Sequence, residues 1–563
     1  MSKKDLAVFI VFVLLFSACN NSKEKPPEKE IVATPEELDQ KVSEHILQSL
    51  DMAEANKGMI DDSIQLDYTD AVKLIYKNNK YKPVWSGRQR WNDIGDTLFH
   101  TIGNAKLYGL FPEDYHFPAL TFIRTKFGKD TLAANDRRDA VAWSKAELMM
   151  TDAFVHMIKD IKLGRLKQDS IRLVKDTVIE NDFYSQRLKL IQKNHSIALI
   201  LHSLEPKHEG YRELKEAIPS FLASANDKTF THVPSPKDKN ENFINALQKR
   251  LYESGHLAYD SVMADSVTLA EAIKKFQKDQ KITVDGKAGE ETVRTMNISD
   301  HERFIHIAIT MDRYKIMPPQ MPSRYILVNL PGYYMYFYQN DTLQLTSKIV
   351  CGKPANRTPL LNSSISELVT YPQWTVPESI IEKEILPGIK KDSDYLAKKG
   401  FSLIDRHGDE VDPYTVEWSK YKKGIPYKVV QGSGDENALG ILKFNFPNKY
   451  AVYLHDTNQR YLFGREKRSL SHGCVRVQNW EKLAYSIVRF DNKEKEKLDK
   501  PSPVEDSLTS WLKRKEKHHI GVRNKLPVYI RYFTCDVKEG KIIFYDDIYG
   551  EDEILREKYF AGK

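Results

Sequence analysis

The chain has 563 residues, 41% of them hydrophobic and 11% aromatic, and its 85 lysines and arginines against 78 acidic residues give a net charge of +7. This length exceeds one ordinary hydrophobic core, so we expect two to four domains. The charges are interspersed without a basic stripe between aromatics, which argues against nucleic acid as a partner. The four cysteines (Cys19, Cys351, Cys474 and Cys535) are too few for a disulfide framework. We expect Cys351 and Cys535 to be free buried thiols, although an exported location would permit a bridge.

Residues 1–19 have the pattern of an export signal. Two lysines precede an apolar run over 6–16, which is too short for a stable transmembrane helix. The following Phe16-Ser17-Ala18-Cys19 is similar to a lipoprotein cleavage box, in which the cysteine becomes the acylated first residue. The alternative is a plain secretory signal with an incidental cysteine. We therefore expect lipidation of Cys19, which with two or three acyl chains would anchor the protein to a membrane.

The next three segments precede the chemistry-bearing part of the chain. We assign 20–62 to a flexible tether, because its first part is charged, contains proline and lacks core-forming residues. Apolar positions at helical spacing predict a helical domain over 63–239. Two amphipathic helical patterns and an Asp-Gly turn predict a three-helix module over 240–300. A connecting helix is expected over 301–321.

Residues 322–563 are expected to form a mostly β domain. Strand-like runs over 325–329 and 333–338 flank a Pro-Gly turn, which predicts a hairpin. Further strands are expected over 348–352, 450–454, 474–477, 528–537 and 541–545. Helical and polar segments interrupt this rhythm over 378–436 and indicate an inserted subdomain. The predicted fold class is therefore multidomain α+β, with helical domains before a mostly β domain.

The chemistry is concentrated in two short segments. His455 comes at the end of a strand-like run, and Cys474 opens the run Cys474-Val475-Arg476-Val477. If this run is extended, the two valines share one face, and Cys474 and Arg476 share the other. An imidazole can take the proton of a thiol, and N–H groups around Gly473 can hold an oxyanion. Two other interpretations are a purely structural Cys and His, and a zinc site of His455, His472 and Cys474 that lacks a fourth ligand.

These residues resemble a known enzyme family. His455 together with Ser471-His472-Gly473-Cys474-Val475-Arg476 closely resembles the motif of L,D-transpeptidases with a YkuD-type catalytic domain. The flanking segments look like the large periplasmic subfamily: Gln431, 437–440, 443–444, 446–448 and 453–457. The resemblance extends from about residue 65 to the C-terminus. It implies a scaffold domain over 63–239, a peptidoglycan-binding-like domain over 240–300 and a capping element over 378–436.

The resemblance also implies an activity. Cys474 would attack the carbonyl of the third residue of a tetrapeptide stem and release D-alanine. An amine on a neighbouring stem would then resolve the thioester and form a 3→3 cross-link. The enzyme would need no cofactor or metal, and its partners would be the stem peptides and glycan of peptidoglycan. It would act in the periplasm, attached through Cys19 to a membrane that the sequence does not specify.

The resemblance gives roles to further residues. His455 would activate Cys474 and protonate the leaving amine, and either the Asp456 side chain or a main-chain carbonyl would orient the imidazole. Main-chain N–H groups of His472, Gly473 and Cys474 would form the oxyanion hole. Arg476 would hold a substrate carboxylate or steady the site. We assign three more residues to substrate binding: Ser471, Trp374 and Tyr453. Trp374 has an alternative role as a core aromatic.

Two alternative functions remain. The first is a hydrolase of the same fold, which would use water as the acceptor and act as an L,D-carboxypeptidase or cut existing cross-links. The second is a non-catalytic lipoprotein that tethers the membrane to the wall through the 240–300 module. That module either binds glycan or stem peptide or only braces the enzyme.

Overall fold

The computed structural model describes residues 28–128, 136–166, 178–226, 228–237, 241–258, 265–280, 282–496 and 505–563. The expected export signal and Cys19 lie outside these ranges. No helix within them is long and apolar enough to span a membrane. The chain divides into two compact units, and we describe each by itself. The first comprises Met1–Gly103, Pro112–Met157 and Glu180–Ile200, and the second comprises Asn104–Phe111, Ile158–Ile179 and Leu201–Lys563.

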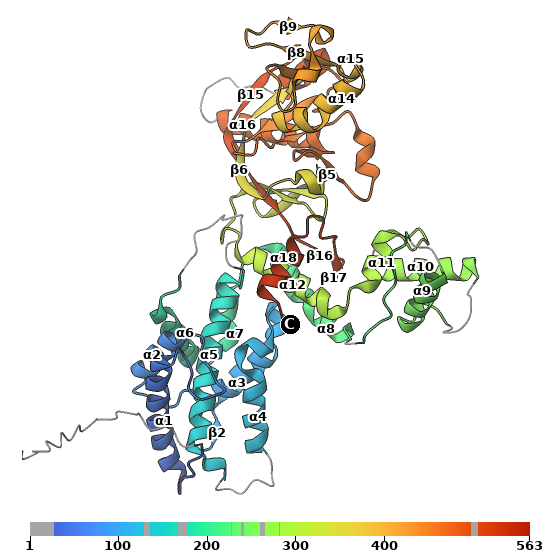
Figure 1. The fold of residues 1–563 in the computed structure, drawn as a ribbon. Helices are drawn as coiled ribbons and strands as arrows, with labels where there is room; N and C mark the ends of the chain where they lie inside the picture. Colours follow the sequence, from blue (N-terminus) through green and yellow to red (C-terminus); the bar gives the residue numbers. More distant parts are fainter. Residues whose placement is uncertain are drawn as a thin grey trace, which may run out of the picture. The chain divides into compact units, whose positions relative to one another are not determined.

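The first unit is helical, as the sequence predicts (Figure 1). Its main helices are α1 (Pro35–Ala55), α2 (Thr69–Asn78), α3 (Asp93–Gly103), α4 (Phe117–Gly128), α5 (Ala140–Leu163, which continues into the second unit), α6 (Asn181–Asn194) and α7 (Ile197–Leu204, likewise shared). The buried carboxylate of Glu147 on α5 organises one loop, since it accepts hydrogen bonds from the N–H groups of Val84 and Trp85 at 2.7 and 3.0 Å. The helical prediction for 63–239 is confirmed for this unit.

Helix α1 corrects the expected flexible tether over 20–62. Thr34 caps the helix by accepting a hydrogen bond from the Glu37 N–H at 3.2 Å. Apolar side chains then recur every four residues and are buried: Leu38, Val42, Ile46 and Leu50. This spacing places them on one face of a helix. The charged and proline-containing start of the segment misled the prediction, because it does not extend into this amphipathic stretch.

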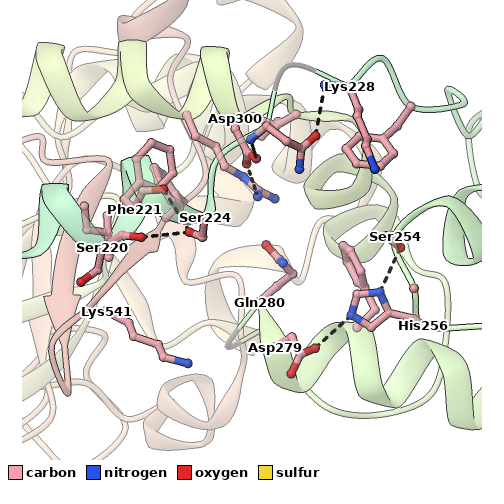
Figure 2. A pocket seen from close by; sticks show the side chains of 18 of the residues that line it. Ser220, Phe221, Ser224, Lys228, Ser254, His256, Asp279, Gln280, Asp300 and Lys541 are labelled. Carbon is pink, nitrogen blue, oxygen red and sulfur yellow. Dashed lines mark hydrogen bonds and ion pairs between the residues drawn. The ribbon is translucent and has the colours of Figure 1, made fainter. Parts of the chain in front are cut away.

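The second unit contains the predicted three-helix module. Its helices are α9 (Glu241–Glu253), α10 (Ser266–Asp279) and α11 (Glu290–Asn297), and they share a small apolar core that includes Leu247, Phe276 and Val293. The connecting helix α12 (Asp300–Lys315) follows as expected. A cavity of about 800 Å³ lies beside the module, and helix α8 (Glu209–Ser224) and strand β17 (Lys541–Phe544) also line it. Figure 2 shows side chains that line this cavity.

A nine-stranded sheet forms the predicted mostly β domain. Its order is β13-β5-β14-β12-β11-β6-β15-β3-β4, and an additional β4–β5 pairing closes it. The strands are β3 (Arg324–Asn329), β4 (Tyr334–Gln339), β5 (Thr342–Gly352), β6 (Leu361–Thr370), β11 (Leu442–Asn445), β12 (Leu454–His455), β13 (Ser469–Ser471), β14 (Val475–Val477) and β15 (His519–Arg531). Alternate residues of the central strands fill one apolar core, among them Leu442, Phe444, Leu454, Val475 and Val477. The alternation therefore fixes which side chains face outward.

Two expected strands differ in extent. The run expected over 450–454 is a loop that becomes a strand only at Leu454, because Ala451 adopts a left-handed φ of 54° that no extended strand contains. The last predicted strand over 528–537 is divided. Its first part belongs to β15 of the main sheet, and β16 (Cys535–Lys538) forms the terminal hairpin with β17.

The inserted segment folds as a small subdomain with its own core. Strands β7 (Trp374–Thr375), β8 (Phe401–Ile404), β9 (Glu410–Val411) and β10 (Lys428–Gln431) form a four-stranded sheet in the order β7-β10-β8-β9. The core includes Ile385, Leu403 and Val429. Because β7 pairs with β10, the subdomain leaves and rejoins the main domain at adjacent points. We call residues 374–431 the capping subdomain.

Candidate active site

The two segments singled out in the sequence form neighbouring parallel strands. Leu454 of β12 pairs with Val475 of β14, and His455 pairs with Arg476. Leu454 and Val475 are fully buried in the core, so the side chains of alternate residues lie on the outer face. The Val475 N–H donates to the Tyr453 main-chain oxygen at 3.1 Å, which brings Cys474 next to Tyr453. The predicted pairing of valines inside with Cys474 and Arg476 outside is therefore confirmed.

Three strands contribute to one row across this outer face. Lys443 of β11 pairs with His455 of β12, which in turn pairs with Arg476 of β14. Lys443 also places its Nζ 3.9 Å from the centre of the Tyr453 ring. His455 thus lies between two cationic residues. The motif pattern gave Lys443 no role of its own. Its position between the inward-facing Leu442 and Phe444 nevertheless indicated an outward side chain.

His455 is held as a neutral imidazole. It is only 4% exposed, and this burial together with the charge of Arg476 lowers its pKa to about 3. Main-chain groups of Asp456 and Leu439 oppose the shift, and Lys443 adds to it. The Nδ1 atom is buried and has no hydrogen-bond partner of good geometry among the described residues. A neutral imidazole is the form that can accept a proton at neutral pH.

Cys474 lies partly exposed on the same face. Protein atoms surround its sulfur, and this burial raises the pKa of the thiol, while hydrogen bonds from Tyr453 and the charges of Lys443 and Arg476 oppose the increase. The Tyr453 hydroxyl also interacts with Trp374 of the capping subdomain. The structure therefore brings Trp374, Tyr453 and Cys474 together, which favours a cleft position for Trp374 over a purely core role.

Hydrogen bonds fix the turn that leads into Cys474. Gly473 adopts a φ of 119°, which favours glycine, and its N–H donates to the Ser471 Oγ at 3.2 Å. The Ser471 hydroxyl in turn donates to the Cys474 main-chain oxygen at 2.6 Å. Ser471 is 3% exposed, and its hydroxyl is used within the turn. The N–H groups of His472 and Cys474 remain as candidate oxyanion donors.

A residue outside the motif also supports this turn. Thr358 donates its hydroxyl proton to the Gly473 main-chain oxygen at 2.8 Å and accepts from the Gly352 N–H at 2.9 Å. The Tyr549 hydroxyl donates to the Gly352 main-chain oxygen at 2.6 Å. Thr358 and Tyr549 are distant in sequence from the motif, so the chain order gave no indication of their role. Through these hydrogen bonds, Thr358 and Tyr549 hold the main chain of Gly352 and Gly473 in place.

The Asp456 side chain does not orient His455. It is 1% exposed, and its carboxylate accepts hydrogen bonds from Arg460 at 2.7 and 3.2 Å and from the Ile441 N–H at 3.1 Å. Gly440 makes room for it, since a Cβ there would lie 2.3 Å from the Asp456 Oδ2. Asp456 therefore ties the loop after β12 to the start of β11, and only its main-chain group acts on His455.

Arg476 and His472 are the remaining predicted site residues. Arg476 donates from Nη1 to the Gln459 Oε1 at 2.9 Å, and its Nε is buried without a hydrogen-bond partner among the described residues. His472 forms a hydrogen bond with Glu384 of the capping subdomain. Cys351 and Cys535 are buried free thiols, as predicted, and lie apart from Cys474 in β5 and β16. Within the described ranges, no three His, Cys, Asp or Glu side chains gather as metal ligands.

Three family models match successive parts of the chain. The L,D-transpeptidase catalytic domain, YkuD, matches 323–491, the scaffold domain matches 70–218, and the model named "Putative peptidoglycan binding domain" matches 240–296. The first match contains both His455 and Cys474.

Relatives agree with these matches. A Haemophilus influenzae protein named "Putative L,D-transpeptidase" is 35% identical over 246 residues, which are 44% of this chain and 48% of the relative. The match thus spans about half the length of that relative. An L,D-transpeptidase from Mycobacterium smegmatis (10% identity, 37% of this chain and 58% of the other, TM-score 0.17) and a variant of one from Enterococcus faecium (11%, 57% and 100%, 0.15) also match. These TM-scores are too low to carry an argument. The chain is therefore similar to L,D-transpeptidases over the segment 323–491, which matches the YkuD catalytic-domain model, and the matches to the scaffold and peptidoglycan-binding models precede that segment.

Proposed function

We propose that the protein is a peptidoglycan L,D-transpeptidase that forms 3→3 cross-links by cysteine acyl transfer. The observation that carries this proposal is the pairing of β12 with β14, which puts a neutral His455 and the partly exposed Cys474 on one face of the sheet. A thiol and a neutral imidazole on one face of a sheet, with main-chain N–H donors at the adjoining turn, are suited to acyl transfer.

The acyl transfer proceeds in two steps. In the first, His455 takes the Cys474 proton as the sulfur attacks the carbonyl of the third stem residue. The C–N bond to D-alanine breaks, and the imidazolium gives its proton to the leaving amine. In the second step, the amine of a neighbouring stem attacks the thioester, an amide forms, and the thiol is regenerated. Arg476, with one buried N–H group unused, is suited to hold a substrate carboxylate.

The setting of this reaction is part of the proposal. The export pattern and the cleavage box ending at Cys19 support a lipid-anchored protein in the periplasm. Residues 240–296 match the model named "Putative peptidoglycan binding domain", which supports a second contact with the wall. Peptidoglycan stem peptides and glycan are therefore the proposed partners.

One product analysis tests the proposal. The purified protein is incubated with tetrapeptide-bearing muropeptides, and the masses of the products are measured by mass spectrometry. We expect cross-linked dimers that have each lost one D-alanine, and none with Cys474→Ala. Tripeptides without dimers would instead identify an L,D-carboxypeptidase. No change in the muropeptides, with binding to the wall retained, would identify a non-catalytic tether.

A further inference from the structure

Lys353 and His472 lie at equivalent places beyond two neighbouring parallel strands. Strand β5 ends at Gly352, strand β13 ends at Ser471, and these two residues are paired. Lys353 is the first residue after β5, and His472 is the first residue after β13. The Lys353 N–H donates to the Ser471 main-chain oxygen at 2.9 Å. The sheet thus brings the Lys353 ammonium and the His472 imidazole together, and His472 is two residues before Cys474 in the sequence.

A carboxylate of the capping subdomain already contacts both groups. Glu384 lies 3.1 Å from the Lys353 Nζ and forms a hydrogen bond with the His472 Nε2. These two partners hold the pKa of Glu384 below its ordinary value, although burial opposes this. Glu384 lies in a single π-helical turn, Ile381–Ile385. Such turns are rare in proteins overall, and those that occur are often found at functional sites.

The contact is open to exchange. The side chains of Lys353, His472 and Glu384 are 39, 29 and 36% exposed. Ion pairs of this exposure contribute little to the stability of a protein. The capping subdomain has its own apolar core, to which Glu384 does not belong. A different carboxylate can therefore replace that of Glu384 at little cost.

We propose that Lys353 and His472 bind a carboxylate of the peptide substrate, and that Glu384 occupies this site until the peptide displaces it. The identity of the ligand as a stem peptide rests on the proposed function. The paired ammonium and imidazole select a negatively charged group, and a peptide bound there would extend to the neighbouring Cys474. Glu384 is accordingly an internal competitor, whereas Lys353 and His472 are binding residues.

Binding measurements with an inactive enzyme test this inference. All variants carry Cys474→Ala, so that the stem tetrapeptide binds without turnover, and its Kd is measured by calorimetry. We expect Glu384→Gln to lower the Kd by about 3- to 10-fold, because the site is then no longer occupied by the competitor. Lys353→Met should raise the Kd by a similar factor. Glu382→Gln removes a charge from the same π-helical turn and should leave the Kd unchanged.

A second ligand identifies the group that is bound. With the same peptide whose carboxylates are converted to amides, neither Glu384→Gln nor Lys353→Met should alter the Kd. Weaker or unchanged binding of the free acid by Glu384→Gln would overturn the inference and identify a structural contact. Equal effects on the acid and the amide, or no binding by any variant, would overturn it as well. Because these Kd values do not depend on product formation, failure of the transpeptidase proposal would be seen separately in the product analysis.

Discussion

Thr358 donates a hydrogen bond to Gly473, the residue before the proposed nucleophile, although 115 residues separate them. Replacing Thr358 by valine keeps the shape and removes the hydroxyl, so two buried main-chain groups lose their partner. We expect a loss of about 1–3 kcal/mol in stability and, from misplacement of the turn, a roughly 10- to 100-fold slower acylation of Cys474. Thr358→Ser retains the hydroxyl and is the control. Wild-type acylation by Thr358→Val would remove Thr358 from the positioning of the site.

The reactivity of Cys474 separates it from the other thiols. The family resemblance implies that carbapenems fit the cleft, so a carbapenem should add its mass to the peptide that contains Ser471 to Arg476. Cys474→Ala should abolish this adduct, and His455→Ala should slow its formation by roughly 100-fold or more. Cys351 and Cys535 should stay unlabelled, because both are buried, and burial raises the pKa of Cys351 to about 12. An adduct on either of them would move the active site elsewhere.

The tip of the capping subdomain is the place to test its movement. Residues 406–412 contain most of the turn after β8, the two residues of β9 and the residue that follows, and most of them are exposed. If the subdomain closes during turnover, shortening this tip should change peptide turnover far more than the melting temperature. Unaltered turnover would contradict a lid function.

Features that depend on neighbouring residues in the sequence could be predicted from it, whereas features that depend on contacts between distant segments could not. The outward side chains of Cys474 and Arg476 followed from alternation within one strand, which is local information. The contacts of Glu384 with His472 and of Thr358 with Gly473 join segments 88 and 115 residues apart, and no local pattern encodes them. The hydrogen bonds of the Ser471 hydroxyl within the turn could not be predicted either, since only the folded turn shows where this hydroxyl points.

The membrane anchor can be tested directly. The box Phe16-Ser17-Ala18-Cys19 predicts that the mature protein begins at Cys19 and carries fatty acyl groups. Mass analysis of the N-terminal peptide should find them, and Cys19→Ser should yield an unprocessed or soluble form. A mature N-terminus at another residue, or an unmodified Cys19, would contradict the prediction.

The low pKa of His455 makes stability depend on pH in a defined direction. The folded protein holds this pKa at about 3, against 6.5 for an unperturbed imidazole. Above pH 6.5 the ring is neutral in both states and has no effect. As the pH falls below 6.5, the unfolded chain binds a proton that the folded chain does not, so the folded state loses stability.

Between pH 7 and pH 4 this single group should reduce the free energy of unfolding by roughly 3 kcal/mol. His455→Gln cannot titrate, so its stability should fall less over this range, whatever its absolute value. Urea unfolding of the catalytic-domain transition at pH 7, 6, 5 and 4 measures the difference. His407→Gln, at an exposed position on the capping tip, should keep the wild-type pH dependence. The same pH dependence in His455→Gln and the wild type would mean that His455 titrates normally and is not held neutral beside Cys474.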